Sequence, residues 1–335
     1  MAEARRALVT GVTGFIGGEL ARGLLERGWT VSGLARGESR AKVPAGVAPV
    51  IGDLGDAASL ARAVQGHDVV FHSAALLSEP ARKSDEVLWQ TANVTGTVAL
   101  ARAALAAGVA RFVQVSTIGV YGNESRTLTE ETPGLPDSVY HRTKLEADDA
   151  LLALHRTEKL PVVILRPPIT VGPGNLKTHL LKMAKLAAKD RFPTFGSDMK
   201  QRLPLVEIED LVDALLLAAD TSALGEMFLI SSGAPYSFGE ILAAMARFSG
   251  ASRGTLAVPG WIGTLGATVC ERIAEATGWA PPLTHHKLAA FRQDRAMDIT
   301  KARTKLGFAP RHVDLDDLLR RALEDYRARG LLPTR

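Results

Sequence analysis

The chain has 335 residues, of which 46% are hydrophobic and 23% charged, a balance typical of an ordinary soluble globular enzyme. This length suits one large α/β unit or two domains and is ample to bury a core. The formal net charge of +4 is small and the basic residues are scattered, so we expect no nucleic-acid partner. The single cysteine, Cys270, excludes an internal disulfide and any cysteine-based metal site, and its apolar neighbours predict a buried packing role.

Two stretches bear on targeting and membranes. Residues 1–6 are charged and too short for a secretory signal, so the chain is predicted to be cytoplasmic. The uncharged residues 255–270 include Pro259 and several glycines, and they fall below the roughly 18 apolar residues of a spanning helix. We expect an amphipathic helix over a pocket, with Trp261, Ile262 and Leu265 as an apolar cover or as core. Contact with a membrane surface is the less favoured alternative.

The first strand and the turn after it carry the clearest local pattern. Residues 7–9 are predicted to form a short buried strand, and residues 19–27 have the apolar spacing of a helix. Between them, Gly11, Gly14 and Gly17 allow the chain to reverse, to approach a pyrophosphate and to pack the helix against the strand. The helix N-terminus would then offer N–H groups to the anion. The spacing GxxGxxG differs from the commoner GxGxxG, and the flanking strand and helix favour a phosphate-binding turn over a plain one.

The next two strands predict how the adenosine end of a dinucleotide is bound. A strand over residues 30–36 ends in Ala35 and Arg36, where an acidic residue would bind the ribose hydroxyls of NAD and an arginine accommodates the 2′-phosphate of NADP. We therefore favour NADP, with NAD possible. Asp53, after a strand over residues 47–51, either contacts adenine or caps the following helix.

A fourth strand over residues 67–75 ends in small side chains. Ala74 and Ala75 leave room for a ribose where the cofactor should lie. His72, within this strand, is expected to be a packed or hydrogen-bonded core histidine rather than a ligand or base.

The alternation of strand and helix predicts the fold. A helix over residues 88–107 carrying Asn93, a strand over 111–116, a helix over 138–154 and a strand over 161–166 continue the pattern. We therefore expect an α/β fold with a Rossmann-type doubly wound parallel sheet over residues 1–170. Residues 171–335 are predicted to form a smaller, mostly helical substrate domain, including helices over 176–189 and 238–248, with residues 204–231 returning to the first domain.

The strongest chemical pattern joins two segments. Ser116 and Thr117 end the fifth strand, and Tyr140 and Lys144 are spaced so that a helix places them on one face, a turn apart. An ammonium there, together with a nicotinamide charge, would lower the tyrosine pKa from its usual value of about 10. Tyr140 could then move a proton, and Thr117, or less favourably Ser116, would orient the substrate oxygen.

With these motifs the chain resembles the extended short-chain dehydrogenase/reductase family, also called the NAD-dependent epimerase/dehydratase family, over nearly its whole length. The matching segments are residues 10–17, 52–54, 70–75, 93–97, 115–122, 140–144, 165–167 and 206–213. The resemblance implies that Tyr140 is the acid/base, that Lys144 binds the nicotinamide ribose and tunes the tyrosine, and that Thr117 positions the substrate. It also implies a homodimer formed through the helices near Asn93 and Tyr140.

No metal site is expected. The residues expected to bind the cofactor lie along these motifs, and they are Gly11, Thr13, Gly14, Phe15, Ile16, Gly17, Arg36, Asp53, Leu54, Ala74, Ala75, Asn93, Ser116, Tyr140, Lys144 and Pro167.

The branch of the family is indicated by further residues. Ile118 follows Thr117 where dehydratases have acidic residues, and Ile169 stands where many nucleotide-sugar epimerases have an asparagine. Arg202 could still bind a phosphate, which keeps an epimerase possible. The end of the chain, at residues 281–284, 298–302 and 305–310, instead resembles the 3β-hydroxysteroid dehydrogenase and dihydroflavonol reductase-like branch.

Three functions follow from this reading. The favoured one is a dehydrogenase or reductase of a secondary alcohol or ketone on a hydrophobic steroid-, flavonoid- or acyl-like molecule. The second is a nucleotide-sugar epimerase with tightly bound NAD and no net cofactor turnover. The third is a non-catalytic protein that senses a dinucleotide, which the complete set of Thr117, Tyr140 and Lys144 argues against.

Overall fold

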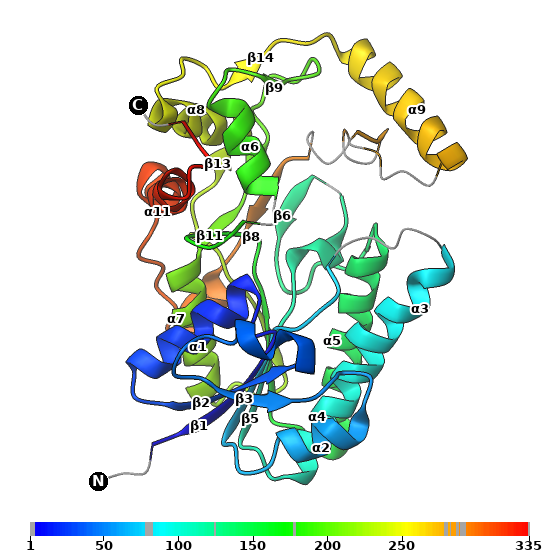
Figure 1. Cartoon of the computed structure of the whole chain (residues 1–335), viewed down its shortest axis with the longest axis vertical. Coiled ribbons are helices and arrows are strands. Elements are labelled where there is room, and N and C mark those ends of the chain that lie inside the picture. The colour runs from blue at the N-terminus through cyan, green and yellow to red at the C-terminus, as the bar shows by residue number, and fades with distance from the viewer. Residues whose placement is uncertain are drawn as a thin grey trace.

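A central sheet of seven parallel strands organises the N-terminal half of the molecule (Figure 1). The computed structural model describes residues 4–77, 83–123, 125–176, 179–277, 281, 283–285, 288 and 293–333. The strand order is β12-β7-β5-β4-β1-β2-β3. The strands are β1 (Arg6–Thr10), β2 (Thr30–Ala35), β3 (Ala48–Ile51), β4 (Val69–His72), β5 (Arg111–Val115), β7 (Val162–Arg166) and β12 (Glu226–Leu229).

Helices cover both faces of this sheet because its strands are apolar on both sides. Val9 of β1 packs in one core with α1 (Phe15–Glu26) and α7 (Ile208–Asp220). Its neighbour Leu8 packs in a second core with α2 (Ala57–Ala63), α4 (Gly96–Ala106) and α5 (Val139–Glu158). The expected α/β Rossmann-type sheet is confirmed.

The helix expected over residues 88–107 contains one wider turn. It consists of α3 (Glu86–Trp89), a π-helical segment (Gln90–Thr95) and α4. A Cβ added to Gly96 would lie 2.7 Å from the carbonyl oxygen of Leu54, so α4 begins where the backbone of the β3–α2 connection touches it. The π segment places Asn93 beside the cavity described below.

The second half of the chain has its own core and is mostly helical. It contains α6 (His179–Ala187), α8 (Phe238–Ser249), α9 (Gly260–Thr277) and α11 (Leu315–Ala328). The helix expected over residues 176–189 is thus shorter than predicted, and residues 177 and 178 of that prediction lie outside the described residues, as does Pro282 of the 281–284 segment.

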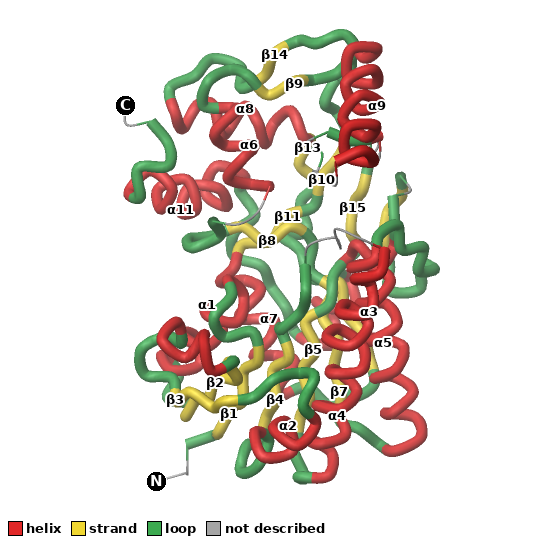
Figure 2. The backbone as a smooth tube through the Cα atoms, turned by 45° about the vertical axis from the view of Figure 1, so that its right-hand side comes forward, coloured by secondary structure: helices red, strands yellow, loops and turns green. Residues whose placement is uncertain are grey.

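Among the described residues, four short strand pairs lie outside the large sheet (Figure 2), and one of them, β6 with β15, joins a segment of the first half of the chain to a segment of the second. The pairs are β8 (Ile169–Val171) with β11 (Leu205–Glu207), β10 (Arg202–Leu203) with β13 (Tyr236–Ser237), β9 (Phe192–Pro193) with β14 (Thr255–Leu256), and β6 (Arg126–Leu128) with β15 (Arg295–Met297). From β11 the chain runs into α7 and then β12, one of the two edge strands of the large sheet. The C-terminal segment also returns, since Ile299 and Phe308 pack in the core of the large sheet.

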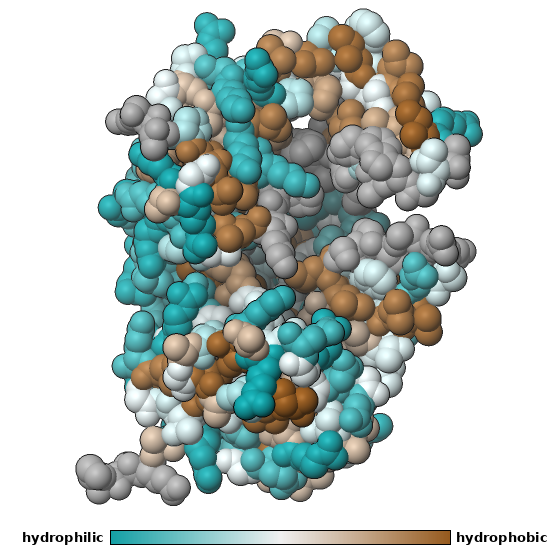
Figure 3. All heavy atoms as spheres, viewed as in Figure 1, coloured by the Kyte–Doolittle hydropathy of each residue, from teal (hydrophilic) through white to brown (hydrophobic). Residues whose placement is uncertain are grey.

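Three apolar residues of α9, expected to cover a pocket or to belong to the core, are exposed instead. Trp261 and Leu265 are 68% and 57% exposed, and Ile262 is 40% exposed. Figure 3 shows hydrophobic side chains along this helix, on the surface at the upper right. Cys270, expected to be buried, is half-buried on the same helix. Among the described helices, none is long and apolar enough to cross a membrane.

Candidate active site

A cavity of about 910 Å³ lies at the C-terminal edge of the large sheet. The strand order reverses between β1 and β4, which is where open α/β sheets form a crevice for ligands. Its walls come from both halves of the chain, with α6, α8, β10 and β11 facing the sheet edge. All the residues predicted to bind a cofactor line it except Asn93: Gly11, Thr13, Gly14, Phe15, Ile16, Gly17, Arg36, Asp53, Leu54, Ala74, Ala75, Ser116, Tyr140, Lys144 and Pro167, together with Thr117.

The glycine turn has no space for side chains. Gly11 has a φ of +68°, and a Cβ there would lie 2.8 Å from the backbone nitrogen of Ala74. A Cβ on Gly17 would lie 2.3 Å from the carbonyl oxygen of Gly11. The turn therefore brings bare backbone to the cavity wall, and the N-cap residue of α1 is Gly14, which has no side chain to cap the helix. These features fit a dinucleotide pyrophosphate at the helix N-terminus.

The end of β2 carries an exposed cation at the cavity. Arg36 forms an ion pair of 3.4 Å with Glu38, and both side chains are exposed. Arg36 and Ser39 line the cavity and Glu38 does not, so the guanidinium is placed where a ligand could compete for it.

Asp53 does not cap the helix that follows it. The N-cap of α2 is Asp56, whose carboxylate accepts hydrogen bonds from the backbone nitrogens of Ala58 and Ser59. The Asp53 carboxylate accepts one from Gly55 N at 2.8 Å, and Asp53 lines the cavity. The expectation that Asp53 caps the following helix is therefore wrong, and its contact with adenine stays a prediction.

His72 is a fully buried core histidine, as expected. Its Nδ1 lies 2.6 Å from Thr10 Oγ1 and its Nε2 lies 2.8 Å from Thr97 Oγ1. Burial lowers the pKa of the imidazole to about 3. His72 therefore joins β1, β4 and α4 beneath the alanines that line the cavity.

Asn93 lies behind the cavity wall rather than in it. Its side chain accepts a hydrogen bond from Leu76 N at 2.8 Å, and it donates to Leu76 O at 3.1 Å and to Thr143 Oγ1 at 3.0 Å. Leu76 lines the cavity, and Thr143 belongs to the helix that carries Tyr140. Asn93 thus fixes one wall segment to α5.

The end of β5 places two hydroxyl groups in different surroundings. Ser116 is buried and donates to Asp148 Oδ2 at 2.6 Å. Thr117 Oγ1 accepts a hydrogen bond from Gly119 N at 3.1 Å, which leaves the proton of its own hydroxyl to be donated to a ligand. Thr117 is therefore better placed than Ser116 to bind a substrate oxygen.

Helix α5 presents Tyr140 and Lys144 to the same cavity. The helix is capped by Ser138, which accepts from His141 N, so it begins just before the tyrosine. Lys144 Nζ donates to Val115 O at 2.8 Å, and burial lowers the pKa of this buried lysine to about 8.

The pKa of Tyr140 was expected to be lowered by Lys144 and a nicotinamide charge, and the surroundings of the phenol act in the other direction. Burial raises the pKa of Tyr140, and the charge of Asp148 raises it further. The neighbouring lysine alone does not bring the phenol toward neutrality, so the remaining stabilisation of a phenolate has to come from a ligand charge.

A buried ion pair lies under these residues and was not predicted from the sequence. Asp148 Oδ2 accepts from Arg166 Nε at 3.0 Å, and Arg166 also donates to the Tyr121 hydroxyl at 2.8 Å. Asp148 is 0% exposed and Arg166 is 3% exposed. Because Tyr140, Lys144 and Asp148 follow at four-residue intervals on α5, the pair lies in line with the proposed catalytic side chains.

The wall built by the second half of the chain is largely apolar. It contains Pro168, Ile169, Thr170, Asn175, Leu180, Met183, Leu203, Leu205 and Ile241. Among the described lining residues, the charged ones are Arg36, Asp53 and Lys144, and all three belong to the sheet half. Trp261, Ile262 and Leu265 do not line this cavity, so the substrate cover expected from them is wrong.

Arg202, the sequence candidate for a phosphate contact, lies outside this cavity. Its guanidinium makes two hydrogen bonds of 2.8 Å to the carboxylate of Asp294, and both residues line a separate, open depression. The arginine is therefore already neutralised by a carboxylate.

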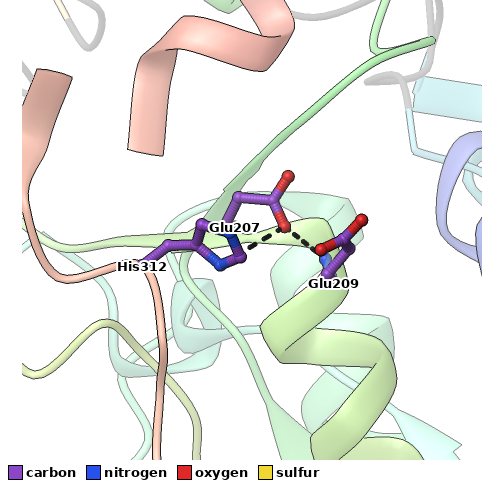
Figure 4. A group of neighbouring side chains, drawn as sticks. All are labelled: Glu207, Glu209 and His312. Atoms are coloured by element: carbon purple, nitrogen blue, oxygen red, sulfur yellow. Dashed lines mark hydrogen bonds and ion pairs between the residues drawn. The ribbon is translucent and has the colours of Figure 1, made fainter. Parts of the chain in front are cut away.

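A cluster of possible metal ligands lies elsewhere, at the junction of β11 and α7 (Figure 4). Glu207 is buried, and it accepts hydrogen bonds from Glu209 N and from Arg321 at 3.1 Å. Arg321 also pairs with Glu209 at 2.6 Å, and His312 bonds to Asp210. Arg321 thus pairs with both glutamates, and the cluster is interpreted as a structural ion-pair network between α7 and α11.

Several known proteins are similar to this chain in sequence and in fold. The UDP-glucose 4-epimerase of Vibrio cholerae is 30% identical over 302 residues, covering 83% of this chain and 91% of that protein. The 3 beta-hydroxysteroid dehydrogenase/Delta 5→4-isomerase of Mycobacterium tuberculosis is 29% identical over 327 residues, covering 92% and 87%. The crystal structure of gox2253 superposes with a TM-score of 0.79 at 27% identity, covering 99% of this chain and 100% of that one.

The family assignment follows from the extent of the match. Residues 7–231, more than half of the chain, match the NAD dependent epimerase/dehydratase family. This range contains the glycine turn, Thr117 and the helix with Tyr140 and Lys144. The chain therefore belongs to the NAD dependent epimerase/dehydratase family, and it is an NAD(P)-dependent enzyme of the extended short-chain dehydrogenase/reductase type.

Proposed function

We propose that the protein is an NAD(P)-dependent dehydrogenase or reductase acting on a secondary alcohol or ketone of a hydrophobic molecule. The observation that carries this proposal is the distribution of charge in the cavity. Arg36, Asp53 and Lys144 line the dinucleotide half, whereas the described residues of the opposite wall are uncharged and largely apolar. Such a wall favours an apolar ligand over a nucleoside diphosphate, whose charges need cationic or strong donor partners.

The proposed roles of the residues follow from their surroundings. Tyr140 transfers its phenolic proton to the carbonyl oxygen during reduction and takes it back during oxidation. Thr117 donates a hydrogen bond to the same oxygen, and Lys144 contributes positive charge beside the phenol. The bound nicotinamide supplies the hydride-transfer chemistry. Ketone, reduced cofactor and one proton give alcohol and oxidised cofactor.

We further propose that the preferred cofactor is NADP. Arg36 is an exposed guanidinium at the end of β2, where the adenosine ribose is expected, and Ser39 adds a hydroxyl to the same wall. A 2′-phosphate would compete with Glu38 for the arginine. Ala35 offers no carboxylate for the ribose hydroxyls of NAD.

A nucleotide-sugar epimerase is the second candidate, and the relative from Vibrio cholerae supports it. Two features of this chain disfavour it. Ile169, an apolar residue, lines the cavity where such epimerases commonly have an asparagine, and Arg202 is paired with Asp294 outside the cavity.

The test is net cofactor turnover. Purified protein is mixed with NADPH and with steroid, bicyclic and long-chain ketones, and separately with UDP-glucose. The proposal expects ketone-dependent oxidation of NADPH that is lost in Tyr140→Phe. Conversion of UDP-glucose to UDP-galactose without net cofactor change would overturn it.

A further inference from the structure

Helix α9 carries its large apolar side chains on the outside. Trp261, Leu265, Val269 and Ile273 follow at four-residue intervals, which places them along one stripe of the helix. Each of them is at least 45% exposed, and Ile262 beside them is 40% exposed. These five residues are called the α9 face. A contiguous exposed apolar surface of this kind marks an interaction site in a folded protein.

The opposite side of α9 packs through small residues. Ala267 is fully buried. A Cβ added to Gly263 would lie 2.6 Å from the ring of Phe195, and one added to Gly266 would lie 3.5 Å from the Leu283 side chain. An amphipathic helix on a globular protein normally has the reverse arrangement, with its large apolar residues inward. The contacts of the glycines therefore fix the α9 face toward the outside.

The hydroxyl groups next to the α9 face need no water. Thr264 Oγ1 donates to Gly260 O at 3.3 Å, and Thr268 Oγ1 donates to Thr264 O at 3.0 Å, in each case one helical turn back. Residues 255–270 contain no charged side chain. This part of the helix can therefore enter an apolar medium without leaving a hydroxyl donor unpaired.

The mouth of the cavity is turned to the same side of the molecule. Leu76, Leu77 and Leu88 line the cavity and are also exposed, so they mark its opening. Val87 on α3, next to them, is 62% exposed. Figures 1 and 2 both show α3 below α9 on one side of the molecule. Exposed apolar side chains thus lie at the cavity mouth and on the helix above it.

Cations accompany the apolar surface. Lys182, Lys185 and Lys189 of α6 and the following Arg191 are exposed, and Asp190 is the one carboxylate of residues 180–191. Figure 3 shows hydrophilic side chains over α6 and hydrophobic ones over α9 on the face turned to the viewer. Cations beside an apolar stripe complement the headgroups and acyl chains of an anionic bilayer.

We propose that the α9 face docks on the surface of an anionic lipid bilayer, with the α6 lysines at the headgroups. Trp261 suits the boundary between headgroups and acyl chains, because its ring is apolar and its N–H is a donor. The helix would lie in the plane of the surface, since none of the described helices is long and apolar enough to cross a membrane. Docking would bring the cavity mouth to the lipid, where a hydrophobic substrate dissolves. That consequence rests on the proposed function, whereas the docking does not.

The experiment measures binding of the purified full chain to vesicles, without ketone or cofactor. Vesicles of phosphatidylcholine mixed with phosphatidylglycerol are sedimented with the protein, and vesicles of phosphatidylcholine alone are compared. The wild type is expected to bind the mixed vesicles more strongly. Trp261→Ser with Leu265→Ser should lower the partition coefficient by about tenfold or more. Leu224→Ser with Val313→Ser, at exposed apolar positions outside α9, is the matched control and should keep binding.

A charge-reversal pair tests the contribution of α6. Lys182→Glu with Lys185→Glu should weaken binding to the mixed vesicles by about tenfold or more, and should change binding to phosphatidylcholine alone far less. Thermal unfolding shows whether each variant is folded. Val269→Ser with Ile273→Ser serves if the first serine pair does not fold.

The outcomes separate docking from the proposed function. Docking is overturned if the wild type does not bind the mixed vesicles, or if a folded α9 variant binds them as the wild type does. It is also overturned if light scattering shows a dimer that the serine pair converts to a monomer, because a second copy then covers the α9 face. None of these results affects the reductase. Vesicle binding without reduction of any ketone would support docking while the proposed function fails.

Discussion

Asp148 lies one helical turn after Lys144 on α5, and its buried carboxylate accepts hydrogen bonds from both Ser116 and Arg166. The carboxylate raises the pKa of Lys144, against the larger lowering by burial, and it also raises the pKa of Tyr140. The ion pair with Arg166 thus contributes to the charge balance around the proposed acid/base.

Replacing this carboxylate should move the pH dependence of the reaction. In Asp148→Asn the negative charge is lost and Arg166 remains, so the pKa values of Tyr140 and Lys144 should both fall. The limb of the pH–kcat profile that reports the ionisation of Tyr140 and Lys144 should therefore move to lower pH, by about one unit or more. The free energy of unfolding should fall by about 3–5 kcal/mol, because a buried cation loses its partner.

Ser116→Ala is the matched control for that variant. It removes one hydrogen bond to the Asp148 carboxylate, worth about 1.5–3 kcal/mol, and keeps the charge. The limb should stay in place in Ser116→Ala. A folded Asp148→Asn protein with an unmoved limb would show that the carboxylate only holds the structure.

The cofactor preference is tested at the end of β2. Arg36→Ala should weaken the binding of NADPH more than that of NADH, because the 2′-phosphate loses a charge-assisted partner. Arg40, an exposed arginine of the same segment that does not line the cavity, supplies the control Arg40→Ala. Titration of each protein with both cofactors is the measurement. Equal losses for the two cofactors in Arg36→Ala would remove the assignment.

The close backbone contact in the glycine turn predicts different effects for two glycine-to-alanine substitutions. Gly17→Ala places a Cβ 2.3 Å from Gly11 O, so the turn must open, and both cofactor affinity and stability should fall. A Cβ on Gly37 meets nothing within 4 Å, so Gly37→Ala should leave both quantities nearly unchanged. Thermal unfolding with and without NADPH measures both effects, and similar behaviour of the two variants would contradict the contact.

Two buried groups should give opposite pH dependences of stability. The pKa of Glu207 is raised from 4.5 to about 7, mainly by burial, so the folded state keeps a proton that the unfolded state releases. Rising pH between these values should therefore destabilise the fold, and Glu207→Gln should remove that trend. The pKa of His72 is lowered from 6.5 to about 3, so falling pH through this range should destabilise the fold, and His72→Gln should remove that trend.

The size of each trend has an upper limit of about 1.4 kcal/mol per pH unit for one proton. Denaturant unfolding of the wild type and both variants at several pH values between 4.5 and 7.5 measures the slopes. Parallel slopes in all three proteins would show that neither group titrates differently in the folded state.

Local patterns in the sequence were sufficient to predict the sheet and the glycine turn. The strands around Val9 and Phe71 are continuous apolar runs between helices of regular spacing, and these features depend on neighbouring residues alone. Tyr140 and Lys144 could be placed on one helix face for the same reason.

Features that depend on distant contacts could not be predicted. The pairing of Asp148 with Arg166 requires that α5 packs against β7. The only local signal for this pair is the position of Asp148, one helical turn after Lys144. Asn93 was expected at the cofactor, but the π segment turns its amide to Leu76 and Thr143. For Trp261 the apolar spacing predicts an amphipathic helix, whereas what covers its apolar face depends on the tertiary structure.

The measurement that tests the central claim most directly is a comparison of Tyr140→Phe with the wild type in ketone-dependent oxidation of NADPH. The variant should keep its affinity for NADPH, measured by titration, and should lose about 10²- to 10⁴-fold in kcat, because the proton donor is missing. Retention of most of the activity would contradict the account. So would NAD retained through purification together with interconversion of UDP-sugars, which would indicate an epimerase.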